Sequence, residues 1–387
     1  MRILFVGRQD SIHTARWISQ VAGRGWDLHL FPSVPGLAGP HPNLRDVTVY
    51  GVSSRRERGL DPSVRLRGFV PAAKAAGVLS WKLEHRFPSA LAWLVRRLKP
   101  DIVHSLETQR AGYMTLAAKQ KGHDGFPPWI VSNWGSDISV FGRVPEHADR
   151  IRAVLAVCDY YSCECERDVA LARDFGFTGT VLPVRPNAGG FDLAKVRELR
   201  EREVPSRRRV IALKGYQHWA GRALVGLKAI ELAADKLRGY RVALHSPGEY
   251  VELAAALASQ ASAIPIDVVS RATHEEIVEL HATARASVAL SIGDGISTSS
   301  LEAMAVGSLP IQSSSSCFGD WVRDGETGLL VVAEDLASVA RVLERAVSND
   351  TLVDEAARVN SAVVEARLEQ MVLARQVAET YEEIVAR

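Results

Sequence analysis

The sequence contains no long hydrophobic run. None of its apolar stretches approaches the roughly 20 residues that a membrane-spanning helix needs, although 47% of the residues are hydrophobic. The first residues, Met1-Arg-Ile-Leu-Phe-Val-Gly7, end too abruptly for a signal peptide and are typical of a first β-strand. We therefore expect a cytoplasmic protein with buried strands.

Cysteine is scarce, with 4 in 387 residues. Cys158, Cys163 and Cys165 lie close together, whereas Cys317 is remote. Cys163 and Cys165 are the pair to consider as metal ligands, but they lack a second pair or a nearby histidine at zinc spacing. We expect reduced structural thiols and no metal site.

The net charge of +2 hides a basic segment. Residues 51–100 hold 11 Lys and Arg against 3 Asp and Glu, with Trp81, Phe87 and Trp93 interleaved. One interpretation is a surface that binds anionic lipid head groups or an anionic acceptor. The alternative is a solvated face with core aromatic residues behind it. Nucleic acid is the weaker hypothesis, because no recognised binding motif accompanies the charge. The basic residues include Arg55, Arg56, Arg58, Arg65, Arg67, Arg96, Arg97 and Lys99.

Short apolar stretches alternate with segments of helical periodicity along the whole chain. This alternation predicts parallel sheets covered by helices. In the first half we expect strands at 2–7, 27–31, 100–105, 129–132 and 159–163, and helices at 13–22 and 166–175. Residues 33–65 are rich in Pro, Gly and Arg, so we expect loops there.

A second series of alternating strands and helices begins at 209–215, which is another short apolar strand that ends in a glycine. Further strands are expected at 241–245, 266–269 and 287–291, and helices at 222–235, 249–258 and 274–284. Thr273-His-Glu-Glu276 is a capping-box pattern. Residues 182–192 contain two prolines and two glycines and are the natural linker. Ligands of open parallel sheets bind beyond the carboxyl ends of the strands, so Gly7, Gly215 and Asp294 should face a cleft.

The most informative segment is Asp294-Gly-Ile-Ser-Thr-Ser-Ser-Leu-Glu302-Ala-Met-Ala-Val-Gly307. It joins a loop to a helix start. Free backbone N–H groups at a helix N-terminus bind phosphate or another anion. A carboxylate in the second turn accepts hydrogen bonds from a neighbouring sugar hydroxyl. The segment therefore indicates a phosphorylated, sugar-bearing ligand.

Three segments of the second half resemble the retaining family 4 ("group 1") glycosyltransferases of GT-B fold. The first is Asp294…Glu302 with Ala-Met-Ala-Val-Gly307, and the second runs from Leu309-Pro-Ile-Gln312 to Asp324-Gly-Glu-Thr-Gly-Leu-Leu-Val331. The third is Leu213-Lys-Gly-Tyr-Gln-His-Trp-Ala-Gly-Arg222. The resemblance covers residues 209–333 well and is looser in the first half.

The resemblance implies an α/β GT-B fold, with two Rossmann-like domains that face each other across a cleft and a C-terminal helix that crosses back to the first. We expect an acceptor domain at 1–187 with helix 367–387, and a nucleotide-sugar-binding domain at 188–366. The implied reaction transfers a sugar with retention of configuration and without metal or cofactor. The nucleotide sugar is a substrate, and a UDP-sugar is the default expectation.

By resemblance, Glu302 binds the nucleotide ribose, although a capping box with Ser299 is the structural alternative. Asp294 stands where the family has a glutamate that touches the transferred sugar; its alternative role is that of a turn residue. The backbone N–H groups of Ile296, Ser297 and Thr298, and the hydroxyls of Ser297, Thr298 and Ser299, would bind the diphosphate, with ordinary N-capping as the alternative.

Arg222 falls on the family's diphosphate lysine, and Arg grips phosphate oxygens bidentately. Tyr216 occupies the family's arginine position, and Lys214 is the candidate to supply the missing cation. For both Arg222 and Lys214, solvated surface charge is the alternative.

In the first half, Asn133-Trp-Gly-Ser-Asp137 resembles the family's His-Gly-x-Asp loop with Trp134 in place of the histidine. A donor sugar that lacks the C6 hydroxyl, or that stacks on the indole, would fit. His13 and His104 are candidates to replace the histidine, and each has a structural role as its alternative. Gly7, at the end of the first strand, is a further expected substrate contact.

The sequence thus predicts a retaining glycosyltransferase that uses a nucleoside-diphosphate sugar and a glycan or lipid-linked acceptor hydroxyl in bacterial glycan or glycolipid assembly. Peripheral contact with the inner membrane face through residues 51–100 is a further hypothesis. A nonhydrolysing sugar-nucleotide epimerase and a catalytically decayed nucleotide-sugar-binding protein remain alternatives. A dinucleotide-binding oxidoreductase is weaker, because neither Gly7 nor Gly215 opens a Gly-x-Gly-x-x-Gly turn.

Overall fold

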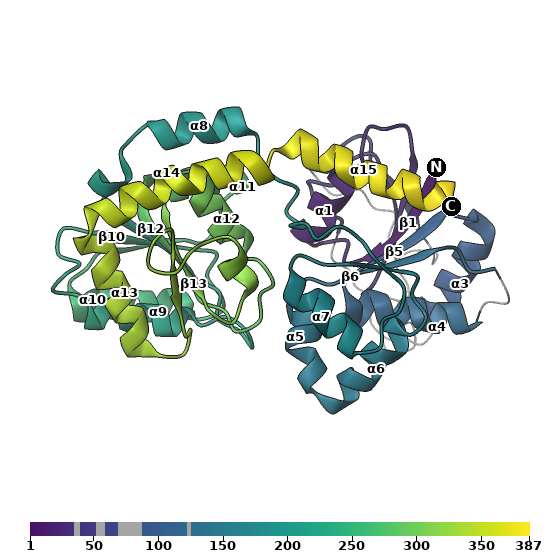
Figure 1. The fold of residues 1–387 in the computed structure, drawn as a ribbon, viewed down its shortest axis with the longest axis horizontal. Helices are drawn as coiled ribbons and strands as arrows, with labels where there is room; N and C mark the ends of the chain where they lie inside the picture. Colours follow the sequence, from purple (N-terminus) through teal and green to yellow (C-terminus); the bar gives the residue numbers. More distant parts are fainter. Residues whose placement is uncertain (35–38, 52–58, 69–86, 122–124) are drawn as a thin grey trace. The chain divides into compact units, whose positions relative to one another are not determined.

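The computed structural model describes residues 1–34, 39–51, 59–68, 87–121 and 125–387. The chain forms two compact units, residues 1–189 with 371–387, and residues 190–370. Each unit is a parallel β-sheet covered by helices (Figure 1). The predicted α/β fold is confirmed. The divisions fall at 189/190 and 370/371, where the sequence analysis placed them at 187/188 and 366/367.

The first unit contains an eight-stranded sheet in the order β4-β3-β2-β1-β5-β6-β7-β8. Every neighbouring pair is parallel. The strands are β1 (Arg2–Gly7), β2 (Asp27–Pro32), β3 (Thr48–Gly51), β4 (Arg65–Gly68), β5 (Ile102–Leu106), β6 (Trp129–Ser132), β7 (Tyr160–Ser162) and β8 (Thr180–Val181). The order reverses on either side of β1, so ligand chemistry is expected beyond the carboxyl end of that strand.

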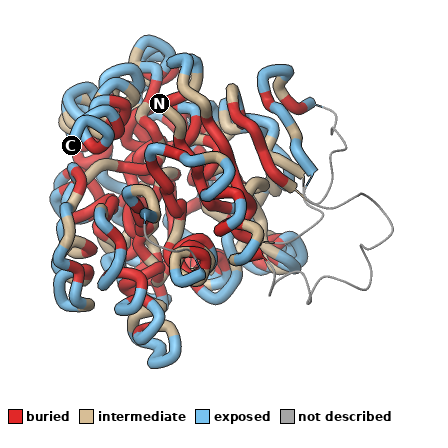
Figure 2. The backbone as a smooth tube through the Cα atoms, turned by 90° about the vertical axis from the view of Figure 1, so that its right-hand side faces the viewer, coloured by how far each residue is buried: buried red, intermediate tan, exposed pale blue. Residues whose placement is uncertain are grey.

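Helices cover both faces of this sheet, and the central strands β1, β5 and β6 are buried between them (Figure 2). One face packs against α1 (Ile12–Ser19) and α15 (Gln370–Ala386). The other packs against α3 (Phe87–Leu98), α4 (Tyr113–Lys121), α6 (Pro145–Leu155) and α7 (Glu166–Asp174). The short α5 (Ser136–Ser139) follows β6. This two-sided burial explains why these central strands are mainly apolar without regular alternation.

The C-terminal helix α15 packs on the first unit, as predicted. Tyr381 of α15 is 2% exposed and accepts a hydrogen bond from Trp17 Nε1 at 2.8 Å. Its hydroxyl also hydrogen-bonds His104 Nδ1 at 2.6 Å. The last helix is therefore fixed to α1 and β5 by buried polar contacts as well as by apolar packing.

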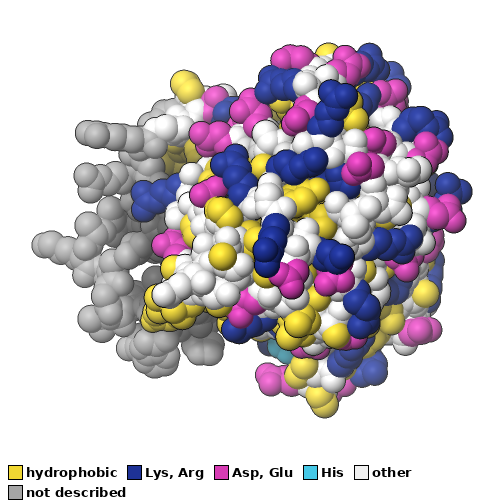
Figure 3. All heavy atoms as spheres, turned by 90° about the vertical axis from the view of Figure 1, so that its left-hand side faces the viewer, with side chains coloured by type: hydrophobic (Ala, Val, Ile, Leu, Met, Phe, Trp, Pro, Cys, Tyr) yellow, Lys and Arg dark blue, Asp and Glu magenta, His cyan; other side chains and the backbone are white. Residues whose placement is uncertain are grey.

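The second unit contains a six-stranded parallel sheet in the order β11-β10-β9-β12-β13-β14. The strands are β9 (Val210–Lys214), β10 (Arg241–His245), β11 (Ile266–Val269), β12 (Ala284–Ala289), β13 (Leu309–Ser313) and β14 (Leu329–Val331). The helices are α8 (Leu193–Glu201), α9 (Ala223–Leu232), α10 (Val251–Ser262), α11 (His274–Thr283), α12 (Thr298–Ala305), α13 (Leu336–Ser348) and α14 (Asp350–Arg367). Acidic and basic side chains are intermixed on the face that Figure 3 shows.

One sequence prediction is wrong. Residues 33–65 were expected to be loops, but they contain β3 and the first residue of β4. β3 pairs with β2 through His29↔Thr48 and Leu30↔Val49. A strand of four residues is too short for its alternation to stand out among the surrounding prolines, glycines and arginines.

The structure tests two sequence expectations, one about the cysteines and one about the basic segment. Cys158 and Cys163 are free and buried, and burial raises the pKa of each thiol to about 12. The expectation of reduced thiols is wrong for Cys165 and Cys317, which are disulfide-bonded; distance along the chain gave no sign of this, because folding decides which thiols meet. Within the basic segment, Phe87 is buried, whereas Trp93 is 49% exposed. Arg55, Arg56, Arg58 and Trp81 lie outside the described residues.

No helix in the described part of the chain has both the length and the apolarity to cross a bilayer.

Candidate functional site

In the second unit, β9 lies between β10 and β12, so the strand order reverses there and the carboxyl end of β9 is the expected ligand position. Gly215 follows β9 directly. A Cβ at Gly215 would lie 2.8 Å from both Leu244 Cδ2 and Pro247 Cα, so no larger residue fits. Gly7 ends β1 in the first unit, where a Cβ would lie 3.2 Å from that of Leu106. At the end of each of these two strands, other residues therefore pack closely against the backbone.

The helix α12 begins where the sequence analysis expected an anion site. Ser297 is its N-cap residue, and Ile296 precedes it. The Ser297 side chain is 3% exposed, and within the described residues its Oγ has no hydrogen-bond partner. Ser299 Oγ, in contrast, bonds His281 Nε2 at 3.0 Å. The first turn, from Thr298, therefore combines N–H groups that have no intrahelical acceptor with a buried, unsatisfied hydroxyl.

Glu302 lies in the second turn of α12 and is 4% exposed. Its Oε1 is 2.7 Å from His274 Nε2, and its Oε2 is 4.0 Å from His281 Nε2. Burial lowers the pKa of His281 to about 4, so this imidazole is neutral at pH 7. Because the N-cap is Ser297, the capping box of Ser299 with Glu302 is absent. The carboxylate is instead positioned by histidines of α11.

The position of His274 follows from the capping box that the sequence predicted. Thr273 Oγ1 accepts from Glu276 N at 3.2 Å, and Glu276 Oε2 accepts from Thr273 N at 2.6 Å. This reciprocal pair fixes the first turn of α11, in which His274 is the first residue. Neither His274 nor His281 was singled out from the sequence, although His274 stands inside the capping-box tetrapeptide.

The charges of Lys214, Arg222 and Asp294 all act on the imidazole of His218. Burial is the largest cause that lowers the pKa of His218; the negative charge of Asp294 opposes it, and the positive charges of Lys214 and Arg222 add to it. Lys214 ends β9, and its Nζ lies 4.3 Å from the ring centroid of Tyr216. His218 was quoted in the matching segment of the sequence but was given no role.

Arg222 has partners of its own in the structure. Its Nε donates to Glu334 Oε1 at 2.8 Å, and its Nη1 donates to the carbonyls of Trp219 and Gly221 at 3.1 and 3.0 Å. The Glu334 side chain is 60% exposed and that of Arg222 is 19% exposed. The guanidinium thus stabilises the loop after β9, and a bound diphosphate would have to replace Glu334.

In the first unit, His13 and Trp134 come together. His13 lies in the first turn of α1, where its N–H donates to Ser11 Oγ at 3.2 Å. The two ring centroids are 5.3 Å apart. Gly135 has φ of 92° and lets the chain turn directly into α5. The indole Nε1 of Trp134 is buried and has no acceptor among the described residues, so it retains a donor for a ligand.

His104 has a structural role. It is fully buried, with Nδ1 bonded to Tyr381 and Nε2 2.8 Å from Ser132 Oγ. Burial lowers its pKa to about 3. It therefore does not take the place of the family's histidine, which leaves His13 as the candidate.

Two acidic residues near the carboxyl end of β5 were not assigned a role from the sequence. Glu107 has φ of 120°, in a region that residues other than glycine rarely adopt. Its Oε1 accepts from Ser33 Oγ at 3.2 Å, and burial raises its pKa. Burial, followed by the charge of Glu107, raises the pKa of Asp137 to about 7. Asp137 accepts from Thr108 N at 2.8 Å, which links the two loops.

Comparison with known families covers both units. The model "Glycosyl transferases group 1" matches residues 228–362, which include Asp294, Ser297 and Glu302. The model "Glycosyl transferase 4-like" matches residues 80–156, which include Glu107 and Trp134. No curated protein sequence matches the chain. The resemblance that the sequence motifs indicated is confirmed.

Solved structures share the fold over the full length of the chain. A sucrose-phosphate synthase from Thermosynechococcus elongatus has a TM-score of 0.73 and 16% identity, with 100% of this chain and 99% of that chain covered. An α,α-trehalose 6-phosphate synthase from Burkholderia multivorans has a TM-score of 0.69 and 13% identity, with 100% and 98% covered. Anabaena HepE in complex with UDP-glucose has a TM-score of 0.65 and 15% identity, with 99% and 100% covered. At these identities the likeness concerns the fold, and the GT-B prediction is confirmed.

Proposed function

We propose that this chain, a glycosyltransferase of GT-B fold with a group 1 domain, transfers a sugar from a nucleoside diphosphate to an acceptor hydroxyl with retention of configuration. The observation that carries the proposal is the start of α12, where the unsatisfied Ser297 Oγ and the first-turn N–H groups lie one turn before the histidine-held Glu302. A diphosphate would accept from the helix start, and ribose hydroxyls would donate to the carboxylate.

The nucleotide is proposed to be a uridine diphosphate and the donor sugar a glucose-like hexose. This choice is supported by HepE, whose structure contains UDP-glucose. Trp134 replaces the histidine that touches the C6 hydroxyl in the resembling family. Its buried, unpaired indole N–H would donate to a sugar hydroxyl from the same position in the chain.

The proposed reaction breaks the bond between the anomeric carbon and the diphosphate oxygen and forms a bond from that carbon to the acceptor oxygen on the same face. The acceptor proton passes to the leaving phosphate. Arg222 and the start of α12 stabilise the charge that develops on the diphosphate, since preorganised donors act most strongly where charge appears. Asp294 orients the sugar and favours the oxocarbenium-like state.

Acceptor binding is proposed for the first unit, with Gly7, His13 and Glu107 at the carboxyl ends of β1 and β5. A role in bacterial glycan or glycolipid assembly, with peripheral contact to an anionic membrane, is supported by the exposed cations Arg65, Arg96 and Lys99. Vesicles of neutral lipid that bound the protein as strongly as anionic vesicles would contradict the membrane contact.

The test of the donor site is a calorimetric titration with UDP and with UDP-glucose. We expect Glu302→Gln to weaken UDP binding by roughly tenfold or more, because a hydrogen bond to a charged group is worth about 1.5–3 kcal/mol. Glu279→Gln, an exposed change of the same charge on α11, is the matched control and should bind UDP normally.

Unchanged UDP affinity in Glu302→Gln would remove the ribose assignment. Product analysis then separates the reaction types. A transferase requires an acceptor to consume UDP-glucose, whereas conversion of the donor sugar to its epimer without an acceptor would contradict the proposed transfer.

A further inference from the structure

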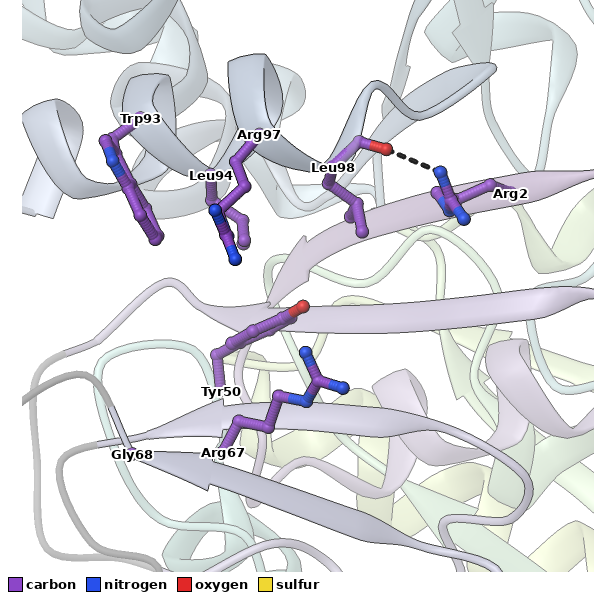
Figure 4. A pocket seen from close by; sticks show the side chains of 8 residues that line it. All are labelled: Arg2, Tyr50, Arg67, Gly68, Trp93, Leu94, Arg97 and Leu98. Atoms are coloured by element: carbon purple, nitrogen blue, oxygen red, sulfur yellow. Dashed lines mark hydrogen bonds between the residues drawn. The ribbon is translucent and has the colours of Figure 1, made fainter.

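A pocket of about 600 Å³ opens in the first unit, away from the residues described above. It lies between the C-terminal half of α3 and the strands β3 and β4 (Figure 4). Arg2 and Leu98 mark its position: Arg2 begins β1, whereas Gly7, at the candidate site, ends it. Nothing in the proposed transfer reaction uses this pocket.

Two guanidinium groups face the pocket from opposite walls. Arg97 extends from α3 and Arg67 from β4 toward the same space (Figure 4). Across the described ranges, neither side chain has a carboxylate within ion-pair distance. Like charges that converge on one space repel each other, and an anion between them removes that cost. Planar guanidinium groups match the oxygens of a phosphate especially well.

The third arginine of the pocket is neutralised, which leaves the other two as the available cations. Arg2 Nε lies 2.7 Å from Asp27 Oδ2, and its Nη1 donates to Leu98 O at 2.7 Å. Asp27 Oδ1 is in turn 2.9 Å from His29 Nε2. Asp27 is therefore held by Arg2 and His29.

Aromatic rings supply the remaining walls. Tyr50 is 5% exposed, and its hydroxyl is bonded to His29 Nδ1 at 3.0 Å, so its ring is fixed. Trp93 is 49% exposed, and Arg97 lies 5.7 Å from its ring centroid. An exposed indole beside two cations suits a ligand that joins an anionic group to an organic body, because the body can pack on the ring.

We propose that this pocket binds a phosphate monoester, with the phosphate between Arg67 and Arg97 and the organic part against Trp93. Such a group occurs on soluble phosphorylated metabolites and on the head group of phosphatidic acid. The pocket is thus a second anion site, separate from the diphosphate site at α12, and it does not depend on the proposed sugar transfer.

The experiment compares two double variants that remove the same charge. Arg67→Gln/Arg97→Gln empties the pocket of both available cations. Arg143→Gln/Arg152→Gln removes two exposed cations of the same unit that do not line the pocket. Thermal unfolding of both variants checks that each is folded. Binding is measured by calorimetry with glycerol 3-phosphate, with glycerol as the uncharged probe, and by sedimentation with phosphatidic acid or phosphatidylcholine vesicles.

We expect glycerol 3-phosphate or phosphatidic acid vesicles to bind the wild type and the Arg143/Arg152 variant, and to bind the Arg67/Arg97 variant at least roughly tenfold more weakly. Binding of the soluble probe identifies a metabolite as the source, and binding of the vesicles alone identifies a lipid. Equal loss in both double variants would show a diffuse charge effect and overturn the proposal. Absence of binding by either probe would overturn it as well.

Discussion

At the scale of single residues, Arg222 has two roles that can be separated. Its guanidinium donates to the carbonyls of Trp219 and Gly221, which stabilises the loop, and it pairs with the exposed Glu334. Exposed ion pairs contribute at most about 1 kcal/mol, so exchange of Glu334 for a diphosphate costs little. The ion pair with Glu334 therefore does not block the proposed contact of Arg222 with phosphate.

We predict that Arg222→Ala lowers kcat for sugar transfer by about 100-fold or more, as loss of a preorganised donor to developing charge does. Glu334→Gln removes the ion pair and keeps the guanidinium, so kcat should stay within about threefold of the wild type. Steady-state rates with saturating UDP-glucose provide the measurement. If both variants lose the same small factor, Arg222 acts on the loop and not on the leaving group.

The candidate-site residues that the sequence predicted belong to contiguous motifs. Ser297 and Glu302 stand in one helix start, and their acceptor and donor chemistry follows from their type and spacing. His274, His218 and Glu107 were missed for a physical reason. Each is a candidate only through contacts that folding creates, such as the 2.7 Å approach of His274 to Glu302 across 28 positions in the chain.

At the scale of elements, the start of α11 connects a helix cap to the candidate nucleotide site. The capping box of Thr273 and Glu276 fixes the first turn, and that turn carries His274 to Glu302. A local rule of helix formation therefore positions a residue that acts in a different helix.

We predict that Thr273→Ala lowers the free energy of unfolding by about 1 kcal/mol, the usual cost of a lost N-cap. UDP affinity should fall as well, because the first turn frays and Glu302 loses its partner. Thr273→Ser retains the hydroxyl and should restore both quantities. Asp335→Ala removes the N-cap of α13 and should lower stability alone. Chemical denaturation and UDP titration test this, and equal UDP affinity in both alanine variants would contradict the link.

The elements with strong periodicity were predictable, and the short edge strands were not. Strand β1 and the start of α11 follow from apolar runs and a capping pattern. Strands β3 and β4 have four residues each, and β4 reads Arg-Leu-Arg-Gly, with three of its residues exposed. Their β-structure depends on pairing with β2 and with each other, which is a tertiary effect that local sequence does not encode.

At the scale of the whole molecule, both units hold neutral histidines in their interiors. Burial lowers the pKa of His104 in the first unit to about 3, and those of His245 and His281 in the second to about 3 and 4. The usual pKa of histidine in an unfolded chain is about 6.5. The unfolded state thus binds more protons at pH 5, and stability falls as pH decreases through about 6.5.

Asp137 has the opposite effect on the pH dependence of stability. Its pKa is raised to about 7, so between about pH 4 and 7 the folded state carries a proton that the unfolded carboxyl has released. Stability from this group is present at low pH and is lost as pH rises through about 7. Near pH 5 the three histidines together have a larger effect than the one aspartate. The free energy of unfolding therefore increases as the pH rises from 5 toward neutral.

We predict that His104→Gln reduces the proton uptake on unfolding at pH 5 by about one, which makes the pH dependence of unfolding shallower. Tyr381→Phe is the matched control, because it leaves Trp17 Nε1 and His104 Nδ1 without their shared partner and yet keeps the histidine. It should cost about 1–3 kcal/mol at every pH and leave the slope unchanged. Denaturation in urea between pH 5 and 8 gives both quantities. A His104→Gln slope equal to that of the wild type would show that His104 is ionised inside the fold, in which case its hydrogen bonds to Tyr381 and Ser132 would need a different protonation from the one described here.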